Sequence, residues 1–264
     1  MMNSNERLLE PATVFLPNLY PLFLDGSSGV RRQLLKLLKC IPAEETLGQA
    51  DQLLLRQRIG MTHLSADIRL FSMELLEWLL DDAGHKIVSC SGGWMKTLDC
   101  FLGLLGWQQY KPRTGQLNCS SGWSTYQRSA VRPENEAKAA SKQMSVLAAF
   151  IRAGIQPPSV ESFEAEAVAR QAEAARWYPL WHTRQHLLPE KPQAFAHLNL
   201  FGPPRDEWSQ MYEDREDRQA LFAKHFRTAI EKGIEQAQGE GGELGRFAAA
   251  VRKAVHEGMS DYDL

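Results

Sequence analysis

The part of the sequence with the clearest chemical character lies between Asp99 and Glu134, an interval without any acidic residue. It combines four cations with several aromatic rings. The cations are Lys111, Arg113, Arg128 and Arg132, and the rings are Phe101, Trp107, Tyr110, Trp123 and Tyr126. Phosphates attract cations, and exposed bases stack on flat rings with about 1–3 kcal/mol each. The interval therefore favours nucleic-acid binding, with the four cations on phosphates and with Trp123 and Tyr126 stacked on bases.

Two other interpretations of this interval stay open. A solvated loop whose tryptophans fill the core would have the same composition, and so would a surface for a protein partner. The net charge of −2 over 264 residues excludes a protein that binds through a global positive field. Any nucleic-acid contact must therefore be local.

Metal binding and catalysis have weaker support in the sequence. His182 and His186 lie four residues apart, so a helix would place both on one face, as a metal site needs, but aromatic residues around them are more typical of a helix face. The cysteines lack CxxC spacing, and they are Cys40, Cys90, Cys100 and Cys119. There is no GxSxG motif and no complete P-loop. We expect no metal and no cofactor, and an enzyme with dispersed active-site residues is the less favoured alternative.

Residues 64–70 alternate between apolar and polar side chains, which is the period of a half-buried strand. Helical patterns follow at 72–83 and 93–107. This strand–helix–helix order resembles ribbon–helix–helix DNA-binding proteins, in which paired strands enter the major groove. The resemblance implies that Ser65, Asp67 and Arg69 face bases, and it makes Arg69 a candidate base-reading residue. Otherwise the strand simply packs under its own helix.

The elements that would position these residues are mostly helical. Three- and four-residue apolar spacing predicts helices at 30–40, 44–58, 72–83, 93–107, 134–153, 161–178, 206–237 and 244–257. Prolines predict an extended segment at 13–24. The fold class is mainly α (α+β), with a short strand or hairpin near 64–70 and 85–130 and a C-terminal helical region.

Composition shifts predict three parts of the chain. They are an N-terminal α+β domain at 1–155 with the basic and aromatic segment 100–133, a helix and proline-rich connection at 156–204, and C-terminal amphipathic helices at 205–264. An exposed apolar stripe on these last helices would bind a partner's groove, which makes a helical adaptor the second functional hypothesis.

The overall composition favours a folded protein rather than a disordered or membrane-spanning one. Hydrophobic residues make up 44% of the chain and charged residues 23%, and no apolar run approaches the roughly 20 residues that cross a bilayer. Glu6 and Glu10 stand where a signal peptide needs positive charge. We expect a bacterial-type cytoplasmic protein that binds DNA or RNA, as a regulator or as a subunit of a nucleoprotein assembly. The oligomeric state stays open.

Overall fold

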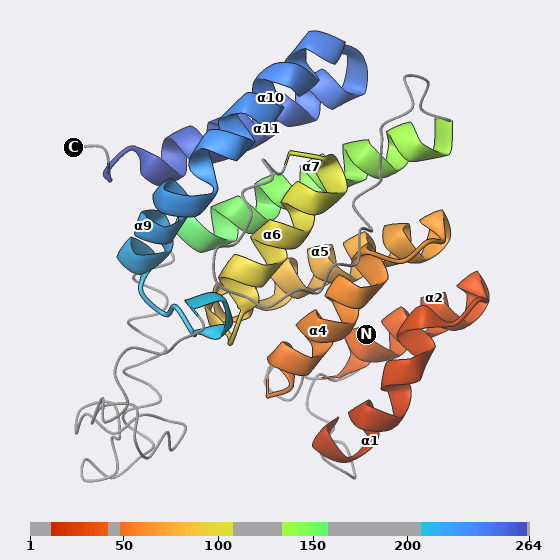
Figure 1. Cartoon of the computed structure of the whole chain (residues 1–264). Coiled ribbons are helices and arrows are strands. Elements are labelled where there is room, and N and C mark those ends of the chain that lie inside the picture. The colour runs from red at the N-terminus through yellow and green to blue at the C-terminus, as the bar shows by residue number, and fades with distance from the viewer. Residues whose placement is uncertain (1–11, 42–47, 108–133, 158–206, 263–264) are drawn as a thin grey trace, which may run out of the picture. The chain divides into compact units, whose positions relative to one another are not determined.

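The computed structural model describes residues 12–41, 48–107, 134–157 and 207–262, and every regular element in these ranges is a helix (Figure 1). In chain order the elements are α1 (Ala12–Leu19), the 3₁₀ helix η1 (Tyr20–Leu24), α2 (Ser28–Cys40), α4 (Ala50–Met61), α5 (Ala66–Ser89), α6 (Gly93–Leu105), α7 (Glu134–Ile155), the 3₁₀ helix η3 (Glu207–Ser209), α9 (Arg215–His225), α10 (Arg227–Glu240) and α11 (Gly242–Met259). The mainly α fold expected from the sequence is confirmed.

The chain divides into two compact units. Met1–Gln156 and Trp208–Leu264 form the first, and Pro157–Glu207 form the second. Helices α9, α10 and α11 therefore share a unit with the N-terminal helices. In the second unit, all residues but Pro157 and Glu207 lie outside the described ranges, as does the helix expected at 161–178.

The strand predicted at 64–70 is wrong, because these residues enter the long helix α5. Ser65 occupies the N-cap position with extended backbone angles, and the helix begins at Ala66. Beyond the short alternation, residues buried along α5 recur at helical spacing, among them Ile68, Phe71 and Leu75. In the interval 85–130, where a short strand or hairpin was expected, residues 85–89 are also helical, beyond a break in the backbone at Ala83. The part of this interval from 108 to 130 lies outside the described residues.

The N-terminal segment expected to be extended folds as α1 and η1 instead. Proline fixes φ at a value that helices also use, so it is compatible with the first turn of a helix. Pro21 lies in the first turn of η1, and Pro17 lies inside α1, which ends two residues later. The long helix expected at 206–237 is divided as well, with a break at the buried Phe226 between α9 and α10.

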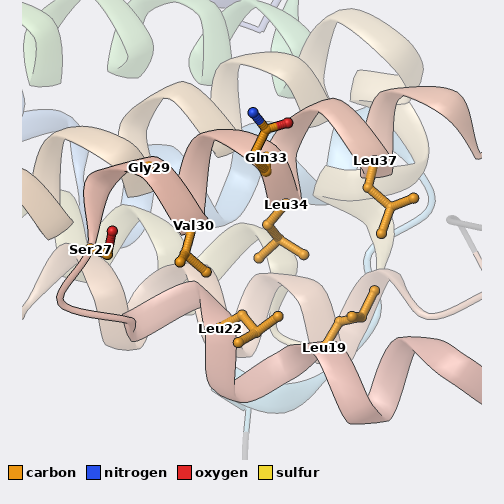
Figure 2. Close-up of a pocket in the computed structure, with 8 residues that line it drawn as sticks. All are labelled: Leu19, Leu22, Ser27, Gly29, Val30, Gln33, Leu34 and Leu37. Atoms are coloured by element: carbon orange, nitrogen blue, oxygen red, sulfur yellow. The ribbon is translucent and has the colours of Figure 1, made fainter.

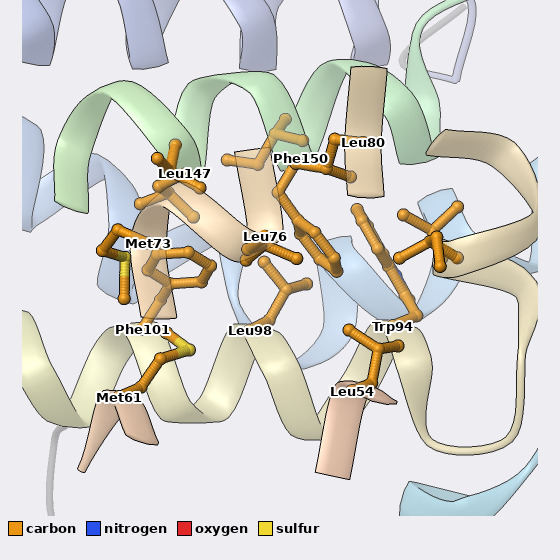
Figure 3. Close-up of a cluster of buried hydrophobic side chains, with 14 of the residues drawn as sticks. Leu54, Met61, Met73, Leu76, Leu80, Trp94, Leu98, Phe101, Leu147 and Phe150 are labelled. Atoms are coloured by element: carbon orange, nitrogen blue, oxygen red, sulfur yellow. The ribbon is translucent and has the colours of Figure 1, made fainter. Parts of the chain in front are cut away.

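The core of the first unit centres on Trp94 of α6, which is fully buried. Its indole stacks on Phe150 of α7 with ring centroids 5.3 Å apart (Figure 3). The ring of Phe222 of α9 lies 6.3 Å from it. The indole nitrogen donates to the carbonyl oxygen of Arg218 at 3.1 Å. A side chain at Gly154 would bring its Cβ within 2.2 Å of the Trp94 ring, so only glycine permits this close approach of α7.

Arg218 connects α9 to the ends of two other helices from inside the core. Its guanidinium donates to the carbonyl oxygens of Gly154 at 2.7 Å, Tyr212 at 2.7 Å and Glu213 at 2.8 Å, and to Oγ of Ser89 at 3.2 Å. Burial lowers the pKa of Arg218, and nearby carboxylates oppose this shift. The side chain thus satisfies a carbonyl oxygen near the C-terminus of α7, where the helix leaves such groups without partners, and contacts a hydroxyl at the end of α5.

The remaining helices complete the unit around α7. Helix α7 packs against α5 on one side and α11 on the other, while α4 packs on α5 and α10 on α11 (Figure 1). None of the helices in the described ranges is both long enough and apolar enough to cross a membrane.

Candidate protein interface

The guanidinium of Arg69, the candidate base-reading residue, forms hydrogen bonds within the turn that precedes α5. Its Nη1 donates to the carbonyl oxygens of His63 at 2.9 Å and Leu64 at 2.8 Å. The backbone nitrogen of Ser65 donates to Nδ1 of the same His63 at 3.0 Å. Because Ser65, Asp67 and Arg69 lie at the start of a helix and not on a strand, the groove-reading arrangement implied by the ribbon–helix–helix resemblance is wrong.

The other six predicted nucleic-acid contacts lie outside the described residues. They are Lys111, Arg113, Trp123, Tyr126, Arg128 and Arg132. Two further aromatic residues of the same interval are described, and both are buried: Phe101 lies in the core beside Phe150, and Trp107 packs on α10. At Trp107, therefore, the alternative interpretation holds, in which a tryptophan of this interval fills the core.

The described residues offer no metal site and no reactive thiol at Cys100. Within the described ranges, no three histidine, cysteine or acidic side chains lie together as metal ligands. His182, His186 and Cys119 are outside these ranges. Burial raises the pKa of the Cys100 thiol to about 12, so this sulfur stays protonated near neutral pH and is a poor nucleophile.

An apolar groove lies between α2 and the α1–η1 segment (Figure 2). Its volume is about 570 Å³. The residues that line it are Leu19, Leu22, Ser27, Gly29, Val30, Gln33, Leu34 and Leu37. Figure 2 shows Val30, Leu34 and Leu37 directed from α2 toward Leu19 and Leu22. The groove thus combines a mostly aliphatic lining with a few small polar groups.

Anchors on the opposite side of these segments hold the groove open. Phe23 and Leu16 are buried in the core, and the Tyr20 hydroxyl donates to Oε1 of Gln49 at 3.3 Å. On α2, the buried Arg31 donates to the carbonyl oxygen of Asp25, and its guanidinium lies 5.8 Å from the centre of the Phe71 ring. Since both walls of the groove are anchored to the core, its apolar lining stays at the surface.

Helix α2 carries buried leucines, exposed apolar residues and exposed cations at different positions around its axis. Leu34 and Leu38 are buried, while Val30 and Leu37 stay exposed at the groove, with 47% of Leu37 accessible to solvent. The three exposed cations of α2 are Arg32, Lys36 and Lys39. Lys36 follows the groove residue Gln33 by three positions, whereas helical spacing places Arg32 and Lys39 on the side of α2 away from Val30 and Leu37.

A second exposed apolar patch lies on α4 and the turn that follows it. Leu55 and Ile59, four residues apart on α4, are both partly exposed, and Leu64 is 90% exposed. The contacts of Arg69 and His63 brace the backbone that carries Leu64. Neither this patch nor the groove was predicted from the sequence, although Val30 and Leu37, apolar residues of α2 that lie beyond its buried face, were a usable signal.

The C-terminal helices do not present the apolar stripe expected of an adaptor there. Phe226, Ile230 and Ile234 are buried in the core, as are Val251 and Val255 of α11. Their spacing reflects packing inside the first unit, so the exposed apolar stripe predicted on these helices is wrong in the described part of the chain, while a partner contact through them stays a prediction.

Comparison with known proteins identifies the family. A family model described as Rix1 complex component involved in 60S ribosome maturation, Ipi1_N, matches residues 44–151. A pre-rRNA-processing protein ipi1 from Aspergillus fumigatus is 44% identical over 254 residues, which cover 96% of this chain and 71% of the relative. The chain belongs to the Ipi1 family.

Other Ipi1 proteins have similar coverage. The relative from Sclerotinia sclerotiorum is 40% identical over 98% of this chain and 72% of its own length. The relative from Pyricularia oryzae is 38% identical over 94% of this chain and 70% of its own length. The match to the Ipi1_N family model begins after α2, so the groove lies outside the residues matched by that model.

Membership of the Ipi1 family corrects two expectations. These relatives are fungal proteins of pre-rRNA processing, so the bacterial-type origin and the DNA-binding function predicted from the sequence are wrong. Composition does not distinguish bacterial from fungal chains, and cations with aromatic rings suit RNA as well as DNA. The expected role in a nucleoprotein assembly agrees with the family description, while direct binding of nucleic acid and the cytoplasmic location stay predictions.

Proposed function

We propose that this chain is a structural subunit of a Rix1-type complex that acts in maturation of the 60S ribosomal subunit. The observation that carries the proposal is the similarity to pre-rRNA-processing proteins over nearly the whole chain. The described surface supports a role in binding rather than catalysis, since it offers anchored apolar features for protein contacts. In this role the helical unit holds other macromolecules in place.

Replacement of the Ipi1 protein in Aspergillus fumigatus by the tagged chain tests this function. The expected result is restored levels of 60S subunits in a sucrose gradient, normal pre-rRNA species on a Northern blot, and co-purification of the strain's Rix1-complex subunits. An empty vector is the negative control. Unrestored 60S levels, with the chain folded and expressed, would contradict the proposal.

A second candidate activity is contact with pre-rRNA through the basic and aromatic segment. The supporting observation is the interval from Cys100 to Pro133, in which no acidic residue opposes its cations. Arg113→Ala combined with Arg128→Ala is expected to weaken RNA binding. In a plot of the logarithm of the binding constant against the logarithm of the salt concentration, the slope should become shallower by roughly one to two.

Gel shifts with single-stranded and duplex RNA at two ionic strengths measure this effect. The matched control replaces Lys232 and Arg246, two exposed cations of α10 and α11, by alanine. Equal loss of binding in both double variants would mean that RNA affinity depends only on the total charge of the protein. Unchanged affinity in the first variant would show that the two arginines do not contact RNA.

A further inference from the structure

We propose that Ser260, at the end of α11, is a phosphorylation site for a protein kinase that selects acidic sequences, and that its phosphate weakens the contacts between α9 and α11. Ser260 occupies the C-cap position of α11, directly before the turn that carries Asp261 and Tyr262. This modification goes beyond the function proposed above and does not depend on it.

The hydroxyl of Ser260 lies at the surface, where an enzyme can reach it. The side chain is exposed, and its Oγ donates to the carbonyl oxygen of Glu257 at 3.0 Å. The residues that follow form a turn, in which Tyr262 is 45% exposed. Residues beyond the end of a helix open more readily than residues within it, so this serine enters an active site without unfolding of α11.

Carboxylates surround Ser260 in the sequence. Asp261 follows it directly, Asp263 lies three residues after it, and Glu257 lies three residues before it. Kinases select their substrates partly by charge, since a basic substrate groove attracts acidic side chains and repels cations. The side chain of Asp261 is 51% exposed although Arg215 binds it, so one side of this carboxylate stays accessible to an enzyme.

This arrangement of charges distinguishes Ser260 from the other hydroxyl-bearing residues. In the whole sequence, no other serine has an acidic residue one or three positions after it. Thr228 has Glu231 at the third position, but Thr228 lies within α10, and Arg227 binds the carboxylate of Glu231 at 3.0 Å. In the described part of the chain, Ser260 is therefore the hydroxyl that best fits such a kinase.

The reaction transfers a phosphoryl group from ATP. Oγ of Ser260 attacks the γ-phosphorus, and an O–P bond forms to the serine. The bond between this phosphorus and the oxygen that bridges it to the β-phosphate breaks, and ADP leaves with the electron pair. The hydroxyl proton passes to a catalytic carboxylate of the kinase. A group with a charge of about −1.5 to −2 at pH 7 thus replaces a neutral hydroxyl.

The phosphate is introduced beside the contacts that hold the end of α11. Arg215 of α9 binds Asp261 through two nitrogens, and its Nε donates to the carbonyl oxygen of Ile155 at 2.7 Å. Gln219 of α9 donates to the carbonyl oxygen of Gly258 at 2.7 Å and to Asp261 at 2.9 Å. Together these bonds hold the last turn of α11 against α9 and the end of α7.

Three effects of the phosphate weaken these contacts. Its charge repels the adjacent carboxylate of Asp261, and it lies at the C-terminus of a helix, where the helix dipole disfavours anions. It also replaces the hydroxyl that donates to the carbonyl oxygen of Glu257. The last turn of α11 then opens more often, while the preceding turns stay packed through the buried Val251 and Val255.

Phosphorylation of the full-length chain in vitro tests the acceptor. The chain is incubated with ATP and a purified serine kinase that selects acidic sequences, and phosphopeptides are identified by mass spectrometry. Ser260→Ala should lower phosphate incorporation at least about tenfold, whereas the control Thr228→Ala should leave it unchanged. Asp263→Asn should slow the reaction at Ser260 about tenfold, because it removes the carboxylate at the third position. Equal incorporation in the unaltered chain and in Ser260→Ala would overturn the proposal.

Mass spectrometry of the tagged chain from the Aspergillus fumigatus strain tests whether the modification occurs in cells. The chain is purified in the presence of phosphatase inhibitors, and phosphate on Ser260 is the expected result. Recovery of the peptide that contains Ser260 only without phosphate would overturn the proposal. This outcome does not depend on restoration of 60S subunits, so it is distinct from the test of the proposed function.

Hydrogen–deuterium exchange measures the effect of the phosphate on the fold. Amides of residues 256–262 should exchange at least about threefold faster in the phosphorylated chain, while amides of residues 246–252 should be unchanged. Treatment with a phosphatase should restore the original rates. Unchanged or slower exchange at the end of α11 would overturn the proposed effect on the contacts with α9.

Discussion

At the scale of single residues, Arg218 is the buried cation on which the junction of α5, α7 and α9 depends. Arg218→Met removes the donors that reach the carbonyl oxygens of Gly154, Tyr212 and Glu213. Buried acceptors without donors lose their hydration and gain nothing in return, so the free energy of unfolding should fall by about 3 kcal/mol. Urea denaturation followed by circular dichroism measures this change.

The control for this prediction is Arg246→Met, which alters an exposed arginine on α11. It should change the free energy of unfolding by no more than about 0.5 kcal/mol. If the two substitutions had the same effect, the hydrogen bonds of Arg218 would not contribute to stability.

Asp261 makes stability depend on pH at the C-terminal end of the described chain. Two nitrogens of Arg215 donate to its carboxylate, at 2.5 and 2.8 Å, and Gln219 donates at 2.9 Å. The hydrogen bond from Arg215 is the main cause that lowers the pKa of Asp261 to about 2, against 3.8 for a free carboxyl. The stabilisation is therefore complete above pH 3.8 and is lost as the pH falls toward 2.

Asp261→Asn should lower the melting temperature at neutral pH and have a progressively smaller effect below pH 3.8. Because the carboxylate is largely exposed, the effect at neutral pH should be small. Thermal melts of both proteins across this range measure the difference. Asp81→Asn, which alters an exposed residue of α5, provides the control. A difference that grows as the pH falls would contradict the prediction.

At the scale of elements, the contact of α10 with the end of α6 depends on a glycine. A Cβ at Gly233 would lie 2.1 Å from the ring of Trp107, which is itself buried. Gly233→Ala should therefore push α10 away and lower the free energy of unfolding by about 1–3 kcal/mol. Chemical denaturation and the fluorescence of the tryptophans report the stability and the shift in packing.

Gly239, on the same helix, offers a matched control, since a Cβ there meets no atom within 4 Å. Gly239→Ala should raise the free energy of unfolding by about 0.5 kcal/mol, because alanine restricts the unfolded chain. Opposite signs for the two substitutions are the expected result, and equal signs would contradict the close contact at Gly233.

At the scale of the whole molecule, α11 is part of the core rather than an appendage. Ala248, Val251, Val255 and Met259 are buried on it, and α7 is its main neighbour. A chain that ends after Gly239 should lose cooperative thermal unfolding and bind a hydrophobic dye, because the apolar side of α7 is uncovered. A chain that ends at Tyr262 is the control. Unchanged cooperative unfolding after the larger truncation would show that α11 is dispensable.

The positions of most helices could be predicted from the sequence because apolar spacing of three and four residues is a local property. The helices expected at 93–107, 134–153 and 244–257 agree closely with α6, α7 and α11. Local patterns failed where two periods competed, at 64–70, and where proline was compatible with two backbone conformations, at 13–24. The sequence also determined the absence of acidic residues from the basic segment. Residues 108–133 of that segment lie outside the described ranges.

Only the tertiary structure decided which apolar faces are buried and which polar groups hold the fold together. Arg218 contacts Ser89, 129 residues earlier in the chain, and Trp94 contacts the backbone of Arg218 across 124 residues. No local pattern contains such pairs. The C-terminal helices and α2 are both amphipathic in sequence, yet α9, α10 and α11 bury their apolar residues in the core while α2 leaves Val30 and Leu37 exposed. Exposure depends on the neighbours that the folded chain supplies, because a helix can bury only the surface that another element covers.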